Sequence, residues 1–151
     1  MKLSIVSTLY CSAPFLEEFY RRVSAAAHLM AGEDYEVIFV NDGSPDHSLQ
    51  LALKLQDKDN HVQVVDLSRN FGHHAAIVAG LEHSRGELIF LQDCDLEEQP
   101  EWLAQFVEKM EETHADVVYG VQLERVSSPV SNFLGEAFWS SLNIMSNVRI
   151  P

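Results

Sequence analysis

The segment Gly86–Glu101 holds the residues best suited to chemistry in this sequence, because an apolar run ends there in a cluster of acids. Leu88–Leu91 is continuous and apolar, which predicts a strand buried on both faces of a parallel sheet. The acids that follow are Asp93, Asp95, Glu97, Glu98 and Glu101. Ligands of open α/β sheets bind at the carboxyl ends of the strands, so this acidic segment is a candidate site.

Asp93 and Asp95 are two residues apart, so on an extended backbone both side chains point the same way. Two such carboxylates repel each other unless a cation lies between them. Mg²⁺ or Mn²⁺ suits this geometry, because a hard divalent ion binds few protein oxygens and keeps positions for phosphate oxygens. The alternative is an acidic, solvated loop that caps the next helix, since acidic residues favour helix N-termini. The pair alone leaves both readings open.

The composition indicates one globular domain and disfavours nucleic acid as a partner. The 151 residues are 46% hydrophobic, which is enough for a real core. The formal net charge is −13 with only ten Lys and Arg, and such a surface repels phosphate backbones. Two cysteines, Cys11 and Cys94, are too few for a disulfide framework and fit a reducing cytoplasm. No apolar run approaches the length that spans a bilayer.

Strand and helix patterns alternate along the chain, which predicts a mostly parallel sheet sandwiched by helices. The expected strands are Leu3–Leu9, Tyr35–Val40, Val62–Leu67, Gly86–Gln92 and Asp116–Val121. The expected helices are Pro14–Ala31, Ser48–Lys58, Ala75–His83, Pro100–Thr113 and Pro129–Ser146. Function should gather in the polar loops at the strand ends, which are Leu9–Ala13, Asn41–Asp46, Ser68–His74 and Asp93–Gln99.

Two of these loops carry groups that could bind a nucleotide. Asp42 could accept a hydrogen bond from a base or a ribose hydroxyl, but the same turn is typical of helix capping by Ser44 or Asp46. Arg69 could neutralise a phosphate, although its loop also fits a helix start with exposed histidines. Cys94 lies between two acids, which should raise its thiol pKa and exclude a nucleophilic role. The dinucleotide fingerprint and the P-loop are both missing.

Four segments together resemble family 2 glycosyltransferases. They are Leu9-Tyr10, Val40–Ser44, Leu67–His73 and Asp93–Leu96. They occur in the same order and at the same strand ends, and the resemblance runs from Ser4 to about Val121 and less clearly to Pro151. The most similar branch includes dolichyl-phosphate mannosyltransferases and bacterial polyprenyl-phosphate or O-antigen sugar transferases.

The resemblance implies an α/β fold of the GT-A type, with residues 1–151 as a single catalytic, donor-binding domain that continues beyond Pro151. It also implies a nucleotide-diphosphate sugar as the donor and Mn²⁺ or Mg²⁺ as the cofactor. The resemblance also implies roles for individual residues. Leu9 and Tyr10 would line the nucleoside pocket, Asp42 would contact the base or ribose, and Arg69, Asn70 and Gly72 would form the floor of the donor site. Asp93 would lie beside the nucleotide, Asp95 would bind the metal, and Glu97 would be a second metal ligand. Asp93 and Asp95 are then the catalytic pair.

Two departures from the family pattern concern the donor pocket and the acceptor. Cys11 and Ser12 follow Tyr10 where the family has Asn and Glu, so one carboxylate near the donor is missing. Gln122 follows the strand expected at Asp116–Val121 where the polyprenyl-phosphate branch has an Arg. That Arg helps to hold the acceptor phosphate, so a lipid-linked or saccharide acceptor stays open beside a polyprenyl phosphate.

The predicted function is an inverting transfer of sugar to such an acceptor in the synthesis of cell-envelope polysaccharide or glycolipid. The enzyme is expected in the cytoplasm or at the cytoplasmic face of the membrane, reached through a part of the chain beyond Pro151. A homodimer is left open. The alternatives are a non-catalytic nucleotide-sugar-binding domain and a phosphotransferase with Asp93 as the nucleophile.

Overall fold

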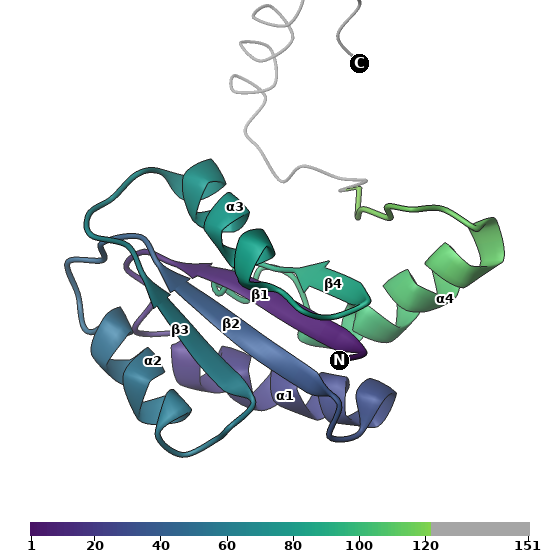
Figure 1. The fold of residues 1–151 in the computed structure, drawn as a ribbon, viewed down its shortest axis with the longest axis horizontal. Helices are drawn as coiled ribbons and strands as arrows, with labels where there is room; N and C mark the ends of the chain where they lie inside the picture. The colour runs from purple at the N-terminus through teal and green to yellow at the C-terminus, as the bar shows by residue number, and fades with distance from the viewer. Residues whose placement is uncertain (122–151) are drawn as a thin grey trace, which may run out of the picture. The chain divides into compact units, whose positions relative to one another are not determined.

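The computed structural model describes residues 1–121, of which residues 1–118 form one compact unit (Figure 1). The elements follow in the order β1 (Leu3–Leu9), α1 (Leu16–Ala31), β2 (Tyr35–Asn41), α2 (Ser48–Gln56), β3 (Val62–Asp66), α3 (His73–His83), β4 (Leu88–Leu91), the short 3₁₀ helix η1 (Pro100–Trp102) and α4 (Leu103–Thr113). Strands and helices therefore alternate as the sequence predicts. Within the described residues, no helix is long and apolar enough to cross a membrane.

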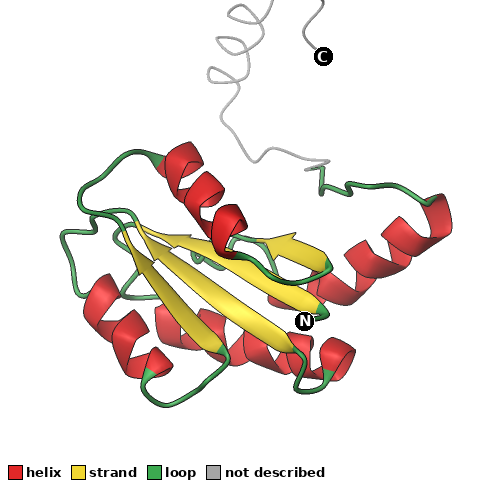
Figure 2. Cartoon of the chain, in the orientation of Figure 1, coloured by secondary structure: helices red, strands yellow, loops and turns green. Residues whose placement is uncertain are grey.

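The four strands form one parallel sheet in the order β3-β2-β1-β4 (Figure 2). β1 lies at the centre and pairs with both β2 and β4. Parallel neighbours cannot be joined by tight turns, so the chain crosses over through a helix or a long loop between strands. The predicted mostly parallel α/β sheet is confirmed for this part of the chain.

Helices cover both faces of the sheet, and each face has its own apolar core. The larger core packs β1 and β2 against α1, with Phe19 in edge contact with Phe39, and also takes in side chains of α2 and α4. The smaller core packs Val6 and Val40 against Ala76 of α3. Gly80 lets α3 approach closely, because a Cβ there would lie only 2.4 Å from Cγ1 of Val6.

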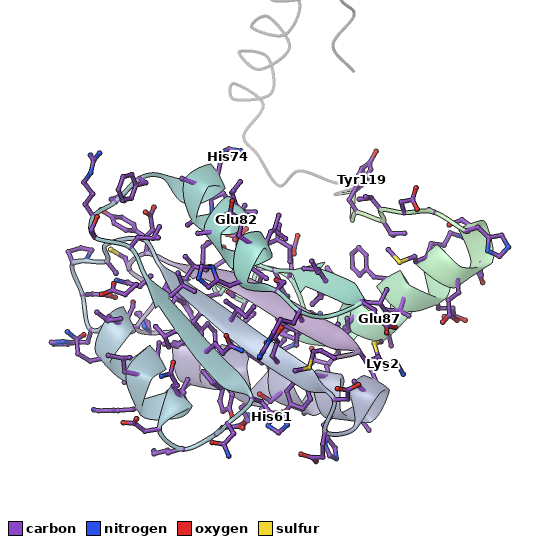
Figure 3. All side chains as sticks on the ribbon, in the orientation of Figure 1. Lys2, His61, His74, Glu82, Glu87 and Tyr119 are labelled. Carbon is purple, nitrogen blue, oxygen red and sulfur yellow. The ribbon has the colours of Figure 1, made fainter. Side chains whose placement is uncertain are left out.

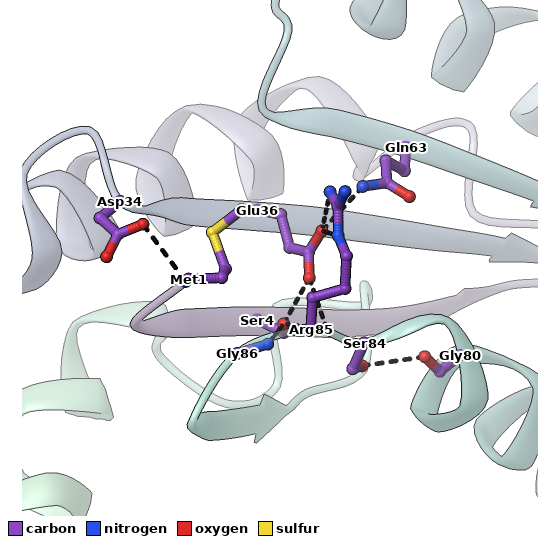
Figure 4. A network of polar contacts seen from close by, with 9 residues as sticks. All are labelled: Met1, Ser4, Asp34, Glu36, Gln63, Gly80, Ser84, Arg85 and Gly86. Carbon is purple, nitrogen blue, oxygen red and sulfur yellow. Dashed lines mark hydrogen bonds and ion pairs between the residues drawn. The ribbon is translucent and has the colours of Figure 1, made fainter.

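A polar network fixes the start of β4 on the face that α3 covers (Figure 4). Glu36 of β2 accepts hydrogen bonds from Ser4 Oγ at 2.6 Å and from Gln63 Nε2 at 2.7 Å. Arg85 donates to the same carboxylate through Nε, Nη2 and its backbone N–H. The backbone N–H of Gly86 donates to Ser4 Oγ at 2.7 Å. The strand that leads to the acidic segment is thereby tied to β1, β2 and β3.

Two sequence predictions about this side of the sheet are wrong in the described structure. Leu88–Leu91 is not buried on both faces, since Ile89 and Leu91 are 46% and 43% exposed. The reason is that β4 is an edge strand among the described residues, and α3 packs over β1 and β2. Asp116–Val121 forms no strand, because no described strand pairs with it and Val117 is exposed. The helix predicted at Pro129–Ser146 lies outside the described residues.

Candidate active site

The loops after β1, β2, β3 and β4 all leave the same edge of the sheet, because the strands are parallel (Figure 2). His74 at the start of α3 belongs to this edge, whereas His61, just before β3, lies at the opposite end (Figure 3). The predicted site residues are therefore gathered on one side of the fold.

Asp42 joins three of these loops through its carboxylate and its backbone. Its side chain is only 3% exposed. Oδ1 accepts a hydrogen bond from the N–H of Phe71 at 2.7 Å, and Oδ2 accepts one from the N–H of Gly72 at 3.0 Å. The N–H of Asp42 itself donates to the carbonyl of Leu9 at 3.0 Å. A residue predicted to contact the nucleoside thus also holds the segment that leads into α3.

Gly43 permits this close approach of the two loops. Its φ is +61°, and a Cβ there would lie 2.5 Å from the backbone carbon of Arg69 and from the backbone nitrogen of Asn70. Both the left-handed conformation and the contact exclude a larger side chain without rearrangement. The Asn41–Asp46 turn and the Ser68–His74 loop therefore touch backbone to backbone.

A clamp of three side chains, Ser44, Asp46 and Ser48, holds the loop after β1. The consecutive N–H groups of Cys11–Ala13 donate to Ser44 Oγ, Ser48 Oγ and Asp46 Oδ2, at 2.8, 3.0 and 3.1 Å respectively. Asp46 Oδ1 also accepts from the N–H of Ser48, the first residue of α2, at 3.0 Å, which agrees with the helix-start role left open for Asp46. Burial raises the pKa of Asp46, but the hydrogen bonds from Ser44, Ser48 and Ala13 outweigh it and hold the pKa well below its usual range.

Leu9 and Tyr10, the pair predicted to line a nucleoside pocket, differ in their surroundings. The Leu9 side chain is fully buried in the larger core, where it supports the loop from below. The Tyr10 side chain is about half exposed at the same edge of the sheet. Of the two, Tyr10 has the ring that a ligand could contact.

The Ser68–His74 loop presents a cation and an aromatic ring. The guanidinium carbon of Arg69 lies 4.4 Å from the centre of the half-exposed Phe71 ring, a cation–π contact. Arg69 forms no ion pair with a carboxylate among residues 1–121, so its charge is available to a ligand. Asn70 Oδ1 accepts from the N–H of Gly72 at 2.9 Å, and the φ of Gly72 is +95°. Asn70 and Gly72 thus shape the loop.

His73 brings this loop next to the acidic segment, a contact that the sequence analysis missed. Its Nδ1 lies 3.2 Å from Thr8 Oγ1 of β1, and its Nε2 lies 3.8 Å from Asp93 Oδ1. The two adjacent histidines were the only signal in the sequence. His73 places Asp93 beside the loop that Asp42 holds, so the ends of β1, β2, β3 and β4 form one connected site.

The acidic segment is a tight turn rather than an extended strand end. β4 ends at Leu91, residues 94–98 turn, and Leu96 has a φ of +62°. The extended backbone invoked for Asp93 and Asp95 is therefore absent, although both are exposed while Cys94 between them is 2% exposed. Asp95 Oδ1 accepts from the N–H of Glu97 at 3.0 Å.

Two other residues of the segment, Cys94 and Glu101, have no part in binding a ligand. Burial, with the negative charges of Asp95 and Asp93, raises the pKa of the Cys94 thiol to about 12, so Cys94 is not a nucleophile at neutral pH. Glu101 accepts from Nε of Arg22 on α1 at 2.8 Å. It is a charge near the start of a helix that also ties η1 to α1.

The oxygen ligands that the acidic segment offers suit a hard divalent ion. Asp95 and Glu97 are exposed carboxylates that pair with no Lys, Arg or His among residues 1–121, and carboxylate oxygens are what Mg²⁺ and Mn²⁺ prefer. No group of three His, Cys, Asp or Glu side chains that could hold a metal by itself occurs in the described part of the chain. An ion of this kind commonly uses one or two carboxylates and fills its remaining positions with water and substrate phosphates.

Fold and comparisons together define the class of protein. The parallel sheet with flanking helices is the α/β fold of GT-A glycosyltransferases, which are also its structural neighbours. Residues 4–149 match the family described as Glycosyl transferase family 2. The chain belongs to this family, as the four segments of its sequence predict.

Relatives of known sequence agree with this assignment. A Mycobacterium tuberculosis protein whose name places it among the glycosyltransferases is 53% identical over 133 residues, covering 88% of this chain and 39% of that protein. The undecaprenyl-phosphate 4-deoxy-4-formamido-L-arabinose transferase of Salmonella paratyphi A is 39% identical over 128 residues, covering 84% of this chain and 38% of that protein. The chain thus spans about two fifths of these relatives.

Solved structures share the fold. Residues 1–349 of TarS from S. aureus superpose with a TM-score of 0.63 at 26% identity, covering 85% of this chain and 39% of that one. The mannosyltransferase PcManGT from Pyrobaculum calidifontis, in complex with GDP-Man and Mn²⁺, superposes with a TM-score of 0.63 at 20% identity, covering 72% of this chain and 32% of that one. At that identity the second match shows the fold alone.

Proposed function

We propose that this chain is the donor-binding part of an inverting, divalent-metal-dependent glycosyltransferase. Its donor would be a nucleotide-diphosphate sugar, and its acceptor a polyprenyl phosphate, another lipid-linked group or a saccharide of the cell envelope. The observation that carries the proposal is the joining of all four strand-end loops, through Asp42 to the Phe71 and Gly72 amides and through His73 to Asp93. A family 2 domain needs such a site to hold the nucleoside, the diphosphate and the sugar together.

The nucleotide would lie across the edge of the sheet between Tyr10 and the acidic turn. Tyr10 offers an exposed ring for the base, and Asp42 has acceptor capacity beyond its two backbone bonds. Arg69 supplies a cation for the donor phosphates. TarS, which shares the fold at 26% identity, has been solved in complex with UDP and with UDP-GlcNAc, which supports a nucleotide-sugar donor here.

The residues that would hold a metal are Asp95 and Glu97. A divalent ion bound there would neutralise the charge that develops on the leaving diphosphate. Asp93 would stand on the nucleotide side of the ion, with its Oδ1 3.8 Å from Nε2 of His73. The exposed carboxylate oxygens of Asp95 and Glu97, with the phosphate oxygens that a donor would bring, support this choice of metal.

The acceptor oxygen would attack the anomeric carbon from the face opposite the diphosphate, which inverts the configuration. A phosphate acceptor is ionised and needs no general base, whereas a hydroxyl acceptor does. The Salmonella relative named as an undecaprenyl-phosphate transferase supports a polyprenyl-phosphate acceptor. Such an acceptor would place the enzyme at the cytoplasmic face of the membrane.

Calorimetry with the full chain tests the donor site. Mn²⁺ with UDP and Mn²⁺ with GDP are titrated into wild type, Asp95→Asn and Glu98→Gln. Asp95→Asn keeps an oxygen for the Glu97 N–H but removes the charge, so metal-dependent binding should weaken by about tenfold or more. Glu98→Gln removes the same charge from the same turn and should bind as wild type does.

The proposal fails if wild type binds neither nucleotide with Mn²⁺, and the metal assignment fails if both variants weaken binding equally. Nucleotide-sugar binding without turnover on any acceptor would instead favour a non-catalytic binding domain. A beryllium fluoride adduct on Asp93, which mimics an aspartyl phosphate, would instead favour the phosphotransferase.

A further inference from the structure

Gln92, the last residue before the acidic segment, is buried and has an unusual hydrogen-bonding pattern. Its side chain is 2% exposed. Its backbone N–H donates to the carbonyl of Val6 on β1 at 3.1 Å, which anchors it to the central strand. Its side-chain Nε2 donates to the carbonyl of Glu98 at 2.9 Å. The side-chain amide of Gln92 therefore links the residue before the turn Asp93–Glu98 to the last residue of the turn.

The orientation of this amide leaves one atom without a partner. The carbonyl of Glu98 can only accept, so the NH₂ group of Gln92 must face it. Gln92 Oε1 is then a buried acceptor that no described residue binds. A buried unpaired acceptor costs stability, so an apolar side chain of equal size would serve the core better. Stability alone thus gives no reason for an amide at this position.

The turn has few other internal restraints. The one further hydrogen bond that the structure records within residues 92–98 is from the N–H of Glu97 to Asp95 Oδ1. Leu96 packs against the larger core, and its φ of +62° is a conformation that a leucine does not adopt unaided. The bond from Gln92 to Glu98 is therefore the main polar contact that keeps the turn closed.

We propose that Gln92 is the positioning residue of the acidic turn. Its amide holds Asp93–Glu98 in the shape in which Asp95 and Glu97 present their carboxylates to one divalent ion. The inference rests on the proposed function for what the turn binds. The closing of the turn is a property of the free protein and can be measured without a ligand.

Cys94 makes that measurement possible, because it is a buried residue of the turn, whereas Cys11 is exposed. Iodoacetamide labelling, followed by mass spectrometry of the two cysteine peptides, reports opening of the turn with Cys11 as the internal reference. In Gln92→Met, a side chain of similar size without the donor, Cys94 should be labelled roughly five- to tenfold faster, the factor that one ordinary hydrogen bond gives. Gln92→Glu, which places an acceptor against the Glu98 carbonyl, should label at least as fast.

The effects of Gln92→Met on nucleotide affinity and on Tm should differ. Gln92→Met should weaken Mn²⁺-dependent nucleotide binding only by the factor by which the closed fraction of the turn falls, so labelling is the more sensitive readout. Its Tm should stay at or above that of wild type because the unpaired acceptor is gone. The matched control is Gln56→Met, which removes the hydrogen bond of 2.8 Å that Gln56 Oε1 accepts from the N–H of Val64 on β3, the strand at the other side of the sheet from β4. It should lower Tm and leave Cys94 labelling and nucleotide binding unchanged.

Wild-type labelling of Cys94 in both Gln92 variants would overturn the proposal. Faster labelling that also occurs in Gln56→Met would overturn it too, since it would report general destabilisation. If wild type binds no nucleotide with Mn²⁺, the proposed function fails, whereas the labelling still decides whether Gln92 holds the turn.

Discussion

Replacing Glu36 by Gln tests the polar network that fixes β4, the strand leading to the acidic turn (Figure 4). Glu36 is 1% exposed, and Oε2 accepts from Arg85 Nε at 3.0 Å, Arg85 Nη2 at 2.6 Å and Gln63 Nε2 at 2.7 Å. Oε1 accepts from Ser4 Oγ and from the N–H of Arg85. Glu36→Gln has the same shape, but its NH₂ group must face donors on one of the two sides.

The magnitude follows from these contacts. Breaking a buried ion pair by removing one partner costs about 3–5 kcal/mol. Arg85 is 62% exposed, so water can solvate its guanidinium and the lower end, about 3 kcal/mol, applies. For a chain of this length each kcal/mol shifts Tm by roughly 2–4 °C, which gives a fall of about 6–12 °C.

The pH dependence has a definite sign. Burial raises the pKa of Glu36, but the hydrogen bonds from the Arg85 side chain, Ser4 and the Arg85 backbone outweigh it, so the pKa lies below its ordinary value of 4.5. A lowered folded-state pKa stabilises the protein above the unfolded-state pKa, and this contribution is lost as the pH falls through the folded-state value. The difference in Tm between wild type and Glu36→Gln should therefore be full at pH 7 and shrink below about pH 4.5.

Thermal unfolding followed by circular dichroism from pH 7 to pH 3.5 measures this difference. Glu112→Gln is the matched control, because it breaks the exposed pair with Lys109, in which both side chains are more than half exposed. Its effect should stay within about 0.5 kcal/mol. A difference for Glu36→Gln that does not change between pH 7 and pH 3.5 would refute the assignment of the network to the ionised carboxylate.

Two further substitutions test the loops around the site. Gly43→Ala should lower the free energy of unfolding by roughly 1–3 kcal/mol, because its φ is +61° and its Cβ would meet the Arg69 backbone at 2.5 Å; urea unfolding measures this, and an unchanged midpoint would contradict it. Asp46→Asn should cost about 1.5–3 kcal/mol through the Ser44 and Ser48 hydroxyls, measured by the same urea unfolding, and a midpoint equal to that of wild type would contradict the clamp.

Local patterns were enough to predict the first three strands and the helices of the described chain. Leu3–Leu9 and Tyr35–Asn41 are apolar runs rich in β-branched residues, and this composition alone predicts buried strands. Burial of Leu88–Leu91 could not be predicted this way, because it depends on which strand lies at the sheet edge. Val117 likewise fits a strand by composition, but a strand also needs a neighbour to pair with.

The site was predictable where a motif places a side chain at a strand end, and not where tertiary contacts decide its neighbours. Asp42 and Asp93 follow directly from such positions. The contact of His73 with Asp93 depends on how α3 packs over β1, which no spacing in the sequence encodes. Gln92 reads as an ordinary strand residue, and its role emerges only from its burial and its bond to Glu98.

Asp42 shows why a residue in this site can be both structural and functional. Its carboxylate already accepts one hydrogen bond at each oxygen, from the Phe71 and Gly72 amides. An ionised carboxylate offers about four acceptor positions, so a hydroxyl or N–H of a nucleoside could use a remaining one. Because the same group shapes the loop that carries Arg69, loss of nucleotide binding on its removal would not by itself prove contact. The predicted nucleoside contact therefore has to be judged against the integrity of that loop.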